Sequence, residues 1–259
     1  RYVQFSQKKI FDGNSKFKTS VIPTGNWRGM VMNTERAPFD NPKVRKAVRL
    51  AVDRQELVDT VMGGEAVVSC DTPVAPTDQY RHNMSCKQNI AEAKKLLKEA
   101  GYPNGIEMVI HVSTKEPTWP TIAEVIQQQV AKAGIKVDIK MTPSKSYWKE
   151  TWMKKDVAMT RWNERSADSV LHEVYHSSAK WNESYYKSSD FDKNLADARG
   201  ELDFKKRKAL YEKAQHTLWE QSGTMIPYHV SKLVVTNSRV KNLDEVEVFS
   251  IQWHKVKVD

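Results

Sequence analysis

Alternating apolar and polar residues predict a strand–helix–strand–helix–strand unit in the middle of the chain. From Ile135 to Met141, apolar residues alternate with charged ones, which is the period of a strand with one buried face. Strands are also expected over Glu107–Ser113 and from Val157 onward, with amphipathic helices between them over Ile122–Ala133 and Ser144–Lys155. Because strands connected by helices pair in parallel with right-handed crossovers, this unit is predicted to be an α/β layer with a parallel sheet.

Four further helices are predicted around this unit. The first is capped by Asn41, begins at Pro42 and continues at helical spacing until Gly63, which suits the left-handed exit of a helix. The other three are expected over Ile90–Ala100, Ser189–Arg199 and Asp203–Gln221.

The two ends of the chain favour extended backbone. Residues 1–26 alternate only weakly and contain turn residues, so a strand pair or a connecting arm is expected there. Trp27–Asn33 is a clearer strand. Beyond the last helix, three more strands are predicted over Met225–Val230, Lys232–Thr236 and Val246–Val258. A β-rich tail after an α/β block suggests that the chain leaves one body there and joins another.

The most unusual polar segment follows the strand that begins at Val157. It combines an aromatic ring, an amide and both signs of charge within seven positions, in Trp162, Asn163, Glu164, Arg165 and Asp168. In α/β proteins, ligands bind beyond the carboxyl ends of the strands, where loops hold polar groups on a rigid sheet. The loop over residues 112–119 leaves the same end, so the two loops are expected side by side. A solvated loop with one tryptophan in the core beneath it is the alternative interpretation.

The segment from His172 to His176 has the H-E-x-x-H pattern of zinc proteases. In those enzymes two imidazoles one helical turn apart bind Zn²⁺, and the glutamate, here Glu173, acts as general base. Such a site also needs a third protein ligand and an open coordination position. Only distant carboxylates such as Glu183 or Glu201 are candidates here, and no spacing favours either. A zinc-dependent peptidase using His172 and His176 is the alternative to a chance or solvated pair.

Composition describes an ordinary globular protein with a basic charge. The 259 residues are 39% hydrophobic and 28% charged, which is enough to bury a core in one large domain or two smaller ones. The formal charge is 41 − 32 = +9, but the basic residues are spread among acidic ones, and the densest run, at residues 205–208, lies on an amphipathic helix. Nucleic acid is therefore not an expected partner, and a weak attraction to anionic lipid headgroups is the alternative use of the charge. No apolar stretch is long enough to cross a bilayer.

The chain has two cysteines, Cys70 and Cys86, in one loop rich in proline, aspartate, threonine and asparagine. A C-x15-C pair without a partner pair of histidines is poor zinc chemistry and plausible disulfide chemistry, with two free thiols as the alternative. A disulfide across a loop of this size stabilises a fold by roughly 3 kcal/mol in the chain-entropy model. It would also indicate an oxidising compartment.

Several stretches resemble the motifs of one protein family and occur in the family's order. Asn33–Ala47 (NTERAPFDNPKVRKA) is similar to the hinge and first helix N-x-x-x-x-P-F-D-D-x-R-V-R-x-A, and Ala91–Gly105 (AEAKKLLKEAGYPNG) to A-K-x-L-L-x-E-A-G-Y-P-x-G. The other matching stretches are Ala51–Arg54, Gly134–Val137, Ser189–Asp192 and Arg207–His229. Together they cover about Trp27 to His229 and resemble the extracytoplasmic solute-binding proteins of the oligopeptide/dipeptide class, family 5.

The resemblance implies the C-terminal lobe of a type II (cluster C) periplasmic-binding-protein fold, which is an α/β lobe with a mixed sheet flanked by helices. Residues 1–33 are then expected to be a connecting arm and hinge strand, 34–222 the ligand-binding lobe, and 223–259 a β-rich return to the N-terminal lobe. That N-terminal lobe would precede Arg1. The start at Arg1, without a methionine or a signal peptide, fits a fragment or a cleaved chain.

The resemblance also implies a binding protein and no enzyme. Such proteins are the substrate-binding components of ABC importers in the periplasm, or otherwise extracytoplasmic and membrane-associated. They close two lobes around a peptide or another small solute and deliver it to a permease in the inner membrane. The expected partners are therefore the ligand, the permease and the missing N-terminal lobe, and no cofactor is expected. In this frame the pair of His172 and His176 lies just past the ligand loop and is more readily an incidental pair.

In peptide-binding relatives a W-x-x-D stretch supplies an aspartate that pairs with the amino terminus of the peptide. The same positions here run from Trp162 to Arg165, so an arginine, which favours a carboxylate or phosphate, replaces the aspartate. Glu164 or Asp168 is a candidate for the amine. Anionic peptides, opines, sugar phosphates and amino-acid conjugates all stay open as ligands. The other positions expected in the cleft are Asn33, Asp71, Thr72, Lys115 and Trp119, the last with the alternative of only stapling its own helix.

Overall fold

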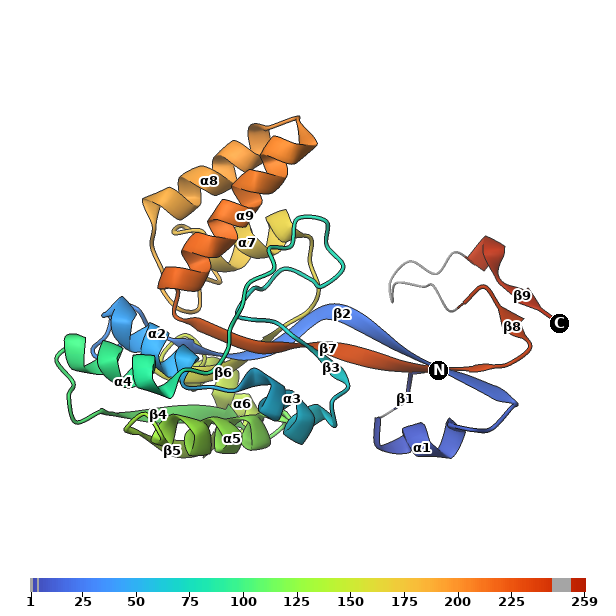
Figure 1. Cartoon of the computed structure of the whole chain (residues 1–259), viewed down its shortest axis with the longest axis horizontal. Helices are drawn as coiled ribbons and strands as arrows, with labels where there is room; N and C mark the ends of the chain where they lie inside the picture. Colours follow the sequence, from blue (N-terminus) through green and yellow to red (C-terminus); the bar gives the residue numbers. More distant parts are fainter. Residues whose placement is uncertain (1, 4, 244–252) are drawn as a thin grey trace.

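Two long antiparallel strands form the spine of the structure (Figure 1). β2 (Phe17–Met32) pairs with β7 (Thr224–Asn237) along nearly its whole length. The computed structural model describes residues 2–3, 5–243 and 253–259. The strand predicted over Trp27–Asn33 is thus the last part of a longer strand, and the two strands predicted over 225–236 are one. Their mutual pairing explains this, because backbone hydrogen bonds to a neighbouring strand hold residues 17–26 extended despite their weak alternation.

The described residues contain a seven-stranded mixed sheet built outward from this pair. On the β2 side lie β6 (Val157–Trp162), β4 (Ile106–Ser113) and β5 (Ile135–Thr142), in that order. On the β7 side, β1 (Tyr2–Val3) and β3 (Ala66–Val68) pair with β7. β4 is parallel to both β5 and β6, which confirms the predicted parallel unit, whereas β6 is antiparallel to β2. β5 is the edge strand at this end of the sheet.

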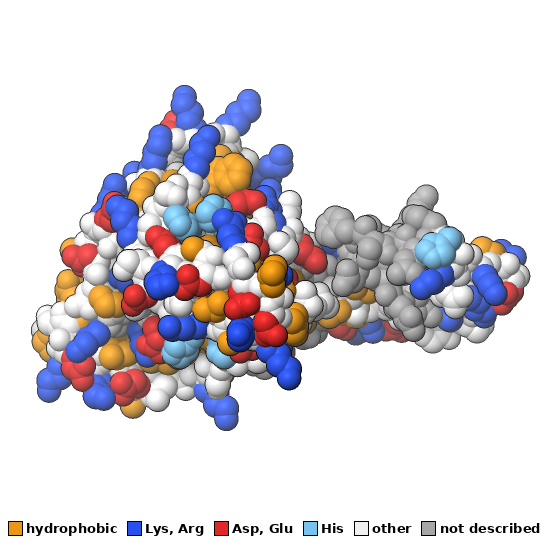
Figure 2. Space-filling view, turned by 90° about the horizontal axis from the view of Figure 1, so that it is seen from above, with side chains coloured by type: hydrophobic (Ala, Val, Ile, Leu, Met, Phe, Trp, Pro, Cys, Tyr) orange, Lys and Arg blue, Asp and Glu red, His pale blue; other side chains and the backbone are white. Residues whose placement is uncertain are grey.

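Helices pack in two groups around separate apolar clusters (Figure 1). The first group packs against the sheet and consists of α2 (Pro42–Leu50), α3 (Arg54–Met62), α4 (Ile90–Glu99) and α5 (Trp119–Ala131). The second group forms its own cluster beside the sheet and consists of α7 (Ala167–Tyr175), α8 (Ser189–Gly200) and α9 (Phe204–Gln221). On the face shown in Figure 2, basic side chains are interspersed with acidic ones.

The single helix predicted from Pro42 to Gly63 is wrong, because it is two helices. Asp53 caps the second one by accepting hydrogen bonds from the backbone N–H groups of the next turn. The last carbonyls of the first helix accept hydrogen bonds from residues outside it. Leu50 O accepts from Asn89 N, and Ala51 O accepts from the Gln88 side chain. These partners replace the continuation of the helical hydrogen bonds.

The helix predicted over Ser144–Lys155 is also shorter than expected. It is reduced to one turn, α6 (Ser144–Ser146), followed by a π-helical turn, η2 (Tyr147–Thr151). The ring of Tyr147 is fully buried, and its hydroxyl donates to backbone carbonyls of both β4 and β6. Anchoring this side chain against β4 and β6 ends the regular helix early.

The terminal segments lie together at the far end of the β2–β7 pair, away from the helices (Figure 1). They are η1 (Phe5–Gln7), α1 (Lys8–Phe11), β8 (Val240–Lys241), η3 (Trp253–Lys255) and β9 (Lys257–Val258). β8 and β9 form a small antiparallel sheet. Of the strand predicted over Val246–Val258, residues 246–252 lie outside the described residues and only β9 is a strand in the remainder.

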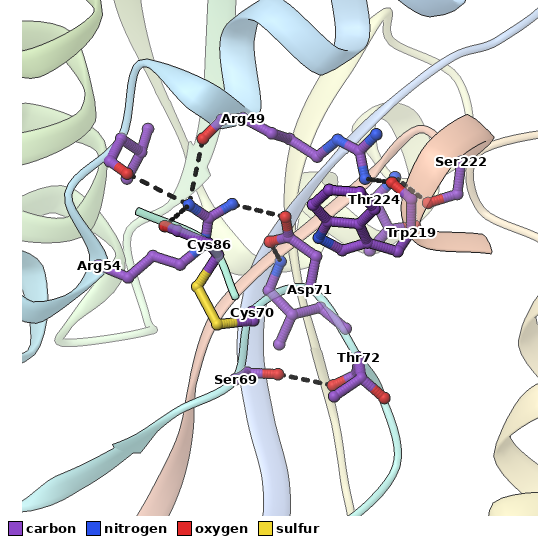
Figure 3. A network of polar contacts seen from close by, with 12 residues as sticks. Arg49, Arg54, Ser69, Cys70, Asp71, Thr72, Cys86, Trp219, Ser222 and Thr224 are labelled. Atoms are coloured by element: carbon purple, nitrogen blue, oxygen red, sulfur yellow. Dashed lines mark hydrogen bonds and ion pairs between the residues drawn. A yellow bond between two sulfur atoms is a disulfide. The ribbon is translucent and has the colours of Figure 1, made fainter. Parts of the chain in front are cut away.

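Buried arginines connect the two groups of helices (Figure 3). Arg45 on α2 donates to the carbonyl of Gln221, and Arg49 donates to the carbonyl of Trp219. Because the last carbonyls of a helix have no partner inside it, these two guanidinium groups complete the end of α9. Burial lowers the pKa of Arg45 to about 10, which still leaves it cationic at neutral pH.

A third arginine forms a buried ion pair beside the disulfide (Figure 3). Arg54 Nη2 lies 2.5 Å from Asp71 Oδ2, and the two side chains are only 3% and 1% exposed. Asp71 Oδ1 accepts from Ile226 N at 2.9 Å, while Arg54 Nη1 also reaches the carbonyl of Cys86. Cys86 is bonded to Cys70, so the predicted disulfide is confirmed.

Replacing Asp71 tests how much the Arg54–Asp71 ion pair contributes to the stability of the fold. The Asp71→Asn variant leaves Arg54 buried without a counter-charge, so we expect the free energy of unfolding to fall by about 3–5 kcal/mol. Urea denaturation of the oxidised protein measures this. Lys136→Met is the matched control, because it breaks an ion pair whose side chains are 78% and 77% exposed and should leave stability unchanged. Equal losses in both variants would contradict the prediction.

Candidate ligand-binding site

A hollow of about 230 Å³ opens at the carboxyl end of β6. Four parts of the chain contribute to it: the turn before β6, the last residues of β6, the loop after it, and the segment that follows α7. The lining residues are Trp148, Trp152, Arg161, Trp162, Asn163, Arg165, Trp181 and Glu183. Three of the residues predicted from the sequence, Trp162, Asn163 and Arg165, are therefore brought together here.

Four of the eight lining residues are tryptophans. The rings of Trp148 and Trp152 are 5.7 Å apart, and those of Trp162 and Trp181 are 6.0 Å apart. Trp148 and Trp181 are 37% and 40% exposed, which is unusual for such large apolar surfaces and is typical of a place that another molecule covers. Trp119 is fully buried beneath them and contacts Trp148 with a ring distance of 6.1 Å.

Each arginine of the hollow is held by a carboxylate and an indole. Arg161 Nε lies 2.8 Å from a carboxylate oxygen of Glu116, and its guanidinium lies 5.9 Å from the centre of the Trp148 ring. Arg165 Nε lies 2.7 Å from Glu173, and its guanidinium lies 5.0 Å from the centre of the Trp162 ring. The Glu116–Arg161 pair joins the loop after β4 to the last residues of β6, next to the loop that follows β6.

Glu183 is a buried carboxylate in the same hollow. It is 4% exposed, and its Oε1 accepts hydrogen bonds from the Trp152 indole and from Thr160 Oγ1 at 2.8 Å. Oε2 and Nε1 of Trp162 form no hydrogen bond of ordinary geometry within the described residues, but the Trp162 indole lies close enough to the carboxyl group to lower its pKa. Burial raises the pKa of Glu183 to about 7, although the neighbouring indole and hydroxyl donors offset part of that effect.

Glu164 connects the loop after β6 to β2. Its Oε2 accepts from Gly25 N at 2.8 Å, and its own backbone N–H donates to Asn26 Oδ1 at 2.8 Å. The register between β2 and β7 shifts between Pro23 and Trp27, so this contact lies at an irregular point of the strand. A Cβ on Gly25 would lie 2.5 Å from Glu164 Cγ, which leaves room only for glycine.

The other predicted site residues have partners within the chain. Asp168 forms two bonds to Arg199 on α8, at 2.6 and 2.9 Å, and one to Tyr211 on α9. Asn33 caps the turn after β2 by accepting from Glu35 N. Asp71 and Thr72 are buried in the network of Figure 3, and Thr72 Oγ1 also donates to Gln215 Oε1. Trp119 is in the core, and Lys115 is exposed. A role of these residues in ligand binding stays a prediction.

The segment with the zinc-protease pattern lacks the rest of a zinc site. The rings of His172 and His176 face each other with centroids 4.8 Å apart. However, Glu173 is occupied, because its two oxygens accept from Ser169 Oγ and Arg165 Nε, each at 2.7 Å. No group of three or more histidine, cysteine or acidic side chains is arranged to hold a metal in the part of the chain that is described. The peptidase alternative has no support.

A second and larger depression, of about 810 Å³, lies at the opposite ends of the strands. It is lined by the first residues of β4, β5 and β6, and its charges are largely paired with each other. Lys136 lies 2.8 Å from Glu107, and Arg36 lies 2.8 Å from Asp156. The smaller hollow is the better candidate because it lies at the carboxyl ends of the strands, where α/β proteins bind ligands.

Residues 2–182 match the family described as bacterial extracellular solute-binding proteins, family 5 Middle. The chain belongs to this family. It is 30% identical over 250 residues to the glutathione-binding protein GsiB of Salmonella typhimurium (strain LT2), in a match that covers 92% of the chain and 48% of GsiB. The periplasmic binding protein DppA of Helicobacter pylori, in complex with the peptide STSA, is 26% identical with a TM-score of 0.78 over 98% of this chain and 51% of DppA. HbpA2 of Haemophilus parasuis is 25% identical with a TM-score of 0.83, covering 98% of this chain and 52% of HbpA2.

These similarities confirm the family and the fold expected from the sequence motifs. The chain spans about half the length of the curated family 5 relatives that it matches. Among the described residues, no helix is both long and apolar enough to cross a membrane.

Sequence reasoning missed five lining residues of the hollow: Trp148, Trp152, Arg161, Trp181 and Glu183. A clue was present, because four of the chain's eight tryptophans fall between positions 148 and 181. Tryptophans so close in sequence, but separated by a strand and a helix, indicate a shared aromatic surface. Glu183 gave no such clue, since only the fold brings it under β6.

The buried carboxyl group of Glu183 predicts a specific dependence of stability on pH. In the folded protein its pKa is raised to about 7 from an ordinary value of 4.5, so between these values the folded state binds more protons than the unfolded state. Stability should therefore fall as the pH rises, by roughly 3 kcal/mol between about pH 5 and pH 8 from this group. Urea denaturation across this range should show the decrease in the wild type and in Glu150→Gln, whose carboxylate is exposed, but not in Glu183→Gln. Parallel profiles for all three proteins would show that Glu183 is not the group responsible.

Proposed function

We propose that this chain is the C-terminal lobe of the substrate-binding component of an ABC importer. It would capture a peptide, or a peptide-like or anionic small solute, between two lobes and deliver it to a permease in the inner membrane. The observation that carries the proposal is the tryptophan- and arginine-lined hollow at the carboxyl end of β6, in a chain of family 5. Membership of an extracellular solute-binding family and the Cys70–Cys86 disulfide both support a location in the periplasm or elsewhere outside the cytoplasm.

The proposed division of the chain follows the β2–β7 pair. Residues 1–33 would be the connecting arm and hinge strand, 34–222 the ligand-binding lobe, and 223–259 the return to an N-terminal lobe. Supporting this division, the terminal segments lie together at the far end of the pair (Figure 1). The coverage of only about half of each relative is consistent with an N-terminal lobe outside this chain.

Closure of the second lobe would bury the ligand against the hollow. Excluding water strengthens each hydrogen bond and charge contact there, because the local dielectric is low. Arg165 is the proposed anchor for a carboxylate, since its guanidinium has more N–H donors than its contacts with Glu173 and the Asn163 carbonyl use. Glu164 would transmit closure, because it fixes the ligand loop to β2 at Gly25.

Ligand capture by the full-length protein is the direct test of this function. Native mass spectrometry should show a bound solute, and titration with glutathione and with short peptides should show which class binds; these probes follow from the names of GsiB and the ligand of DppA. Arg165→Ala should weaken binding of an anionic probe by roughly ten- to hundredfold, because a charge-assisted hydrogen bond is lost. Arg36→Ala, on the opposite depression, should bind as the wild type does. Unchanged affinity in Arg165→Ala would remove that role from the arginine.

The link between the ligand loop and β2 has its own test. Gly25→Ala places a Cβ against Glu164 and Ala75, so we expect it to reduce the free energy of unfolding by about 1–3 kcal/mol and to weaken ligand binding. Gly200→Ala is the control, because a Cβ there meets nothing within 4 Å. Thermal melting and titration of both variants would measure the two effects. If Gly25→Ala binds and melts like the wild type, the loop does not depend on this contact.

A further inference from the structure

The larger depression, of about 810 Å³, has the size and lining of a small-molecule site. Side chains alternate between the two faces of a strand, so every second residue of β4 packs with the first group of helices. The residues between them, Glu107, Val109 and His111, line the depression on the opposite face. Val109 is 39% exposed there, and Ala37 and Pro38 add apolar surface. Binding pockets for small molecules typically combine apolar walls with a few polar groups in this way.

His111 is a buried polar side chain of this lining that has no partner. It is only 8% exposed, and its Nδ1 is shielded from solvent and forms no hydrogen bond within the described residues. None of the described residues bonds Nε2 either, and Nε2 is not shielded in this way, so it is the ring nitrogen that a molecule in the depression can reach. A buried polar group without a partner costs stability, and a bound ligand relieves that cost.

The ring of His111 is neutral at pH 7 and presents an N–H donor to the depression. Burial lowers the pKa of His111, and Lys155 and Lys140 lower it further, each by more than Asp156 or Asp138 raises it. A neutral imidazole carries one proton. On Nδ1 that proton would have no acceptor, so we place it on Nε2, where it can bond solvent or a ligand. The depression therefore offers a hydrogen-bond donor, which an oxygen of a ligand complements.

The charges around His111 favour an anion. Of the seven lysine, arginine, aspartate and glutamate side chains in the lining, four are used in the two ion pairs described above. The three that form no ion pair among the described residues are Lys154, Lys155 and Asp138. Lys140 adds another positive charge, because it stands opposite His111 in the register of β5 on β4 and so shares its face of the sheet. Three lysines against one aspartate leave a local positive excess.

We propose that the larger depression is a second binding site, for a small organic oxyanion. The phosphate or carboxylate group of this ligand accepts a hydrogen bond from His111 Nε2, and Lys154 and Lys155 balance its charge. The organic part of the ligand covers the exposed surface of Val109. The depression shares no lining residue with the tryptophan-lined hollow, so this site is distinct from the one proposed for the transported solute.

Two aromatic anions and one neutral analogue test this site. The full-length protein is titrated by calorimetry with phenyl phosphate, with benzoate and with benzyl alcohol, in a buffer that contains no phosphate or carboxylate. All three probes have the same ring, but only the first two carry an oxyanion. The wild type should bind at least one of the anions saturably, and at least about tenfold more tightly than benzyl alcohol, which corresponds to one charge-assisted hydrogen bond.

The decisive variant is His111→Phe. Phenylalanine keeps a planar ring of similar size but has no N–H donor, so anion binding should fall at least about tenfold. The ligand-free variant should melt no lower than the wild type, because the substitution removes a buried nitrogen that has no partner. Weaker binding without a loss of stability separates a histidine that contacts the ligand from one that only supports the fold.

A pair of lysine variants gives an independent test. Lys155→Gln removes one positive charge near His111 and leaves the core untouched, so it should weaken anion binding by about threefold or more without changing the melting temperature. Lys94→Gln is the matched control, because it removes an exposed lysine from α4, on the other face of the sheet, and should bind the anions as the wild type does. This pair decides the question if His111→Phe melts early.

Three results would overturn the oxyanion site. Binding of none of the probes, or equal binding of benzyl alcohol and the anions, would show that the depression does not select an oxyanion. Unchanged anion binding in folded His111→Phe would reduce the effect to a general attraction to surface lysines. Loss of anion binding in Arg165→Ala, together with full binding in His111→Phe, would place the anion in the hollow. Each of these results leaves the proposed transport function in place, because that function depends on other residues.

Discussion

The pairing of β2 with β7 is the constraint on which the rest of the structure depends. It joins residues from the two ends of the chain, and closing so large a loop has an entropic cost that the long run of strand hydrogen bonds must offset. The contact is also very close. Met32 N donates to Gly223 O at 2.7 Å, and a Cβ on Gly223 would lie 2.1 Å from Met32 O. Only glycine fits at the point where α9 turns into β7, so the whole second group of helices is positioned through this residue.

The hollow is organised before any ligand arrives. Each of its two arginines is fixed between a carboxylate and an indole, and these contacts limit the side-chain freedom that binding would otherwise remove. The loop that carries Arg165 is in turn tied to β2 through Glu164.

The sequence predicted the regular parts of the fold well, because hydrophobic period is a local property. The parallel unit around β4, the caps at Asn41 and Asn89 and the disulfide followed from patterns that neighbouring residues determine. Its failures have a common physical cause, which is a partner distant in sequence. The backbone N–H of Asn89 bonds the Leu50 carbonyl, which in a longer helix would accept the next helical hydrogen bond. In the same way, carbonyls of β4 and β6 accept from the hydroxyl of Tyr147, where a longer helix was expected.

The same distinction applies to the candidate site. Trp162, Asn163 and Arg165 were predicted because they fall within four positions at the end of a strand and combine an aromatic ring, an amide and a charge, and all three line the hollow. The sequence favoured Asp168 as a binding residue just as much. However, Asp168 belongs to α7, and its side chain bonds Arg199 and Tyr211 on the neighbouring helices. Glu183 depended on a segment after α7 folding back under β6, which no local pattern indicates. Side-chain direction, and so the choice among nearby polar residues, is decided by tertiary packing.

The position of β5 at the edge of the sheet bears on whether the protein aggregates at high concentration. A border strand offers its unused backbone groups to any other extended chain, which is the first step of fibre growth. Here Lys136, Asp138 and Lys140 alternate along that strand on its exposed face, where a second strand would have to bring its own side chains against charges of both signs. Stacking of one molecule onto another along this edge is thereby disfavoured.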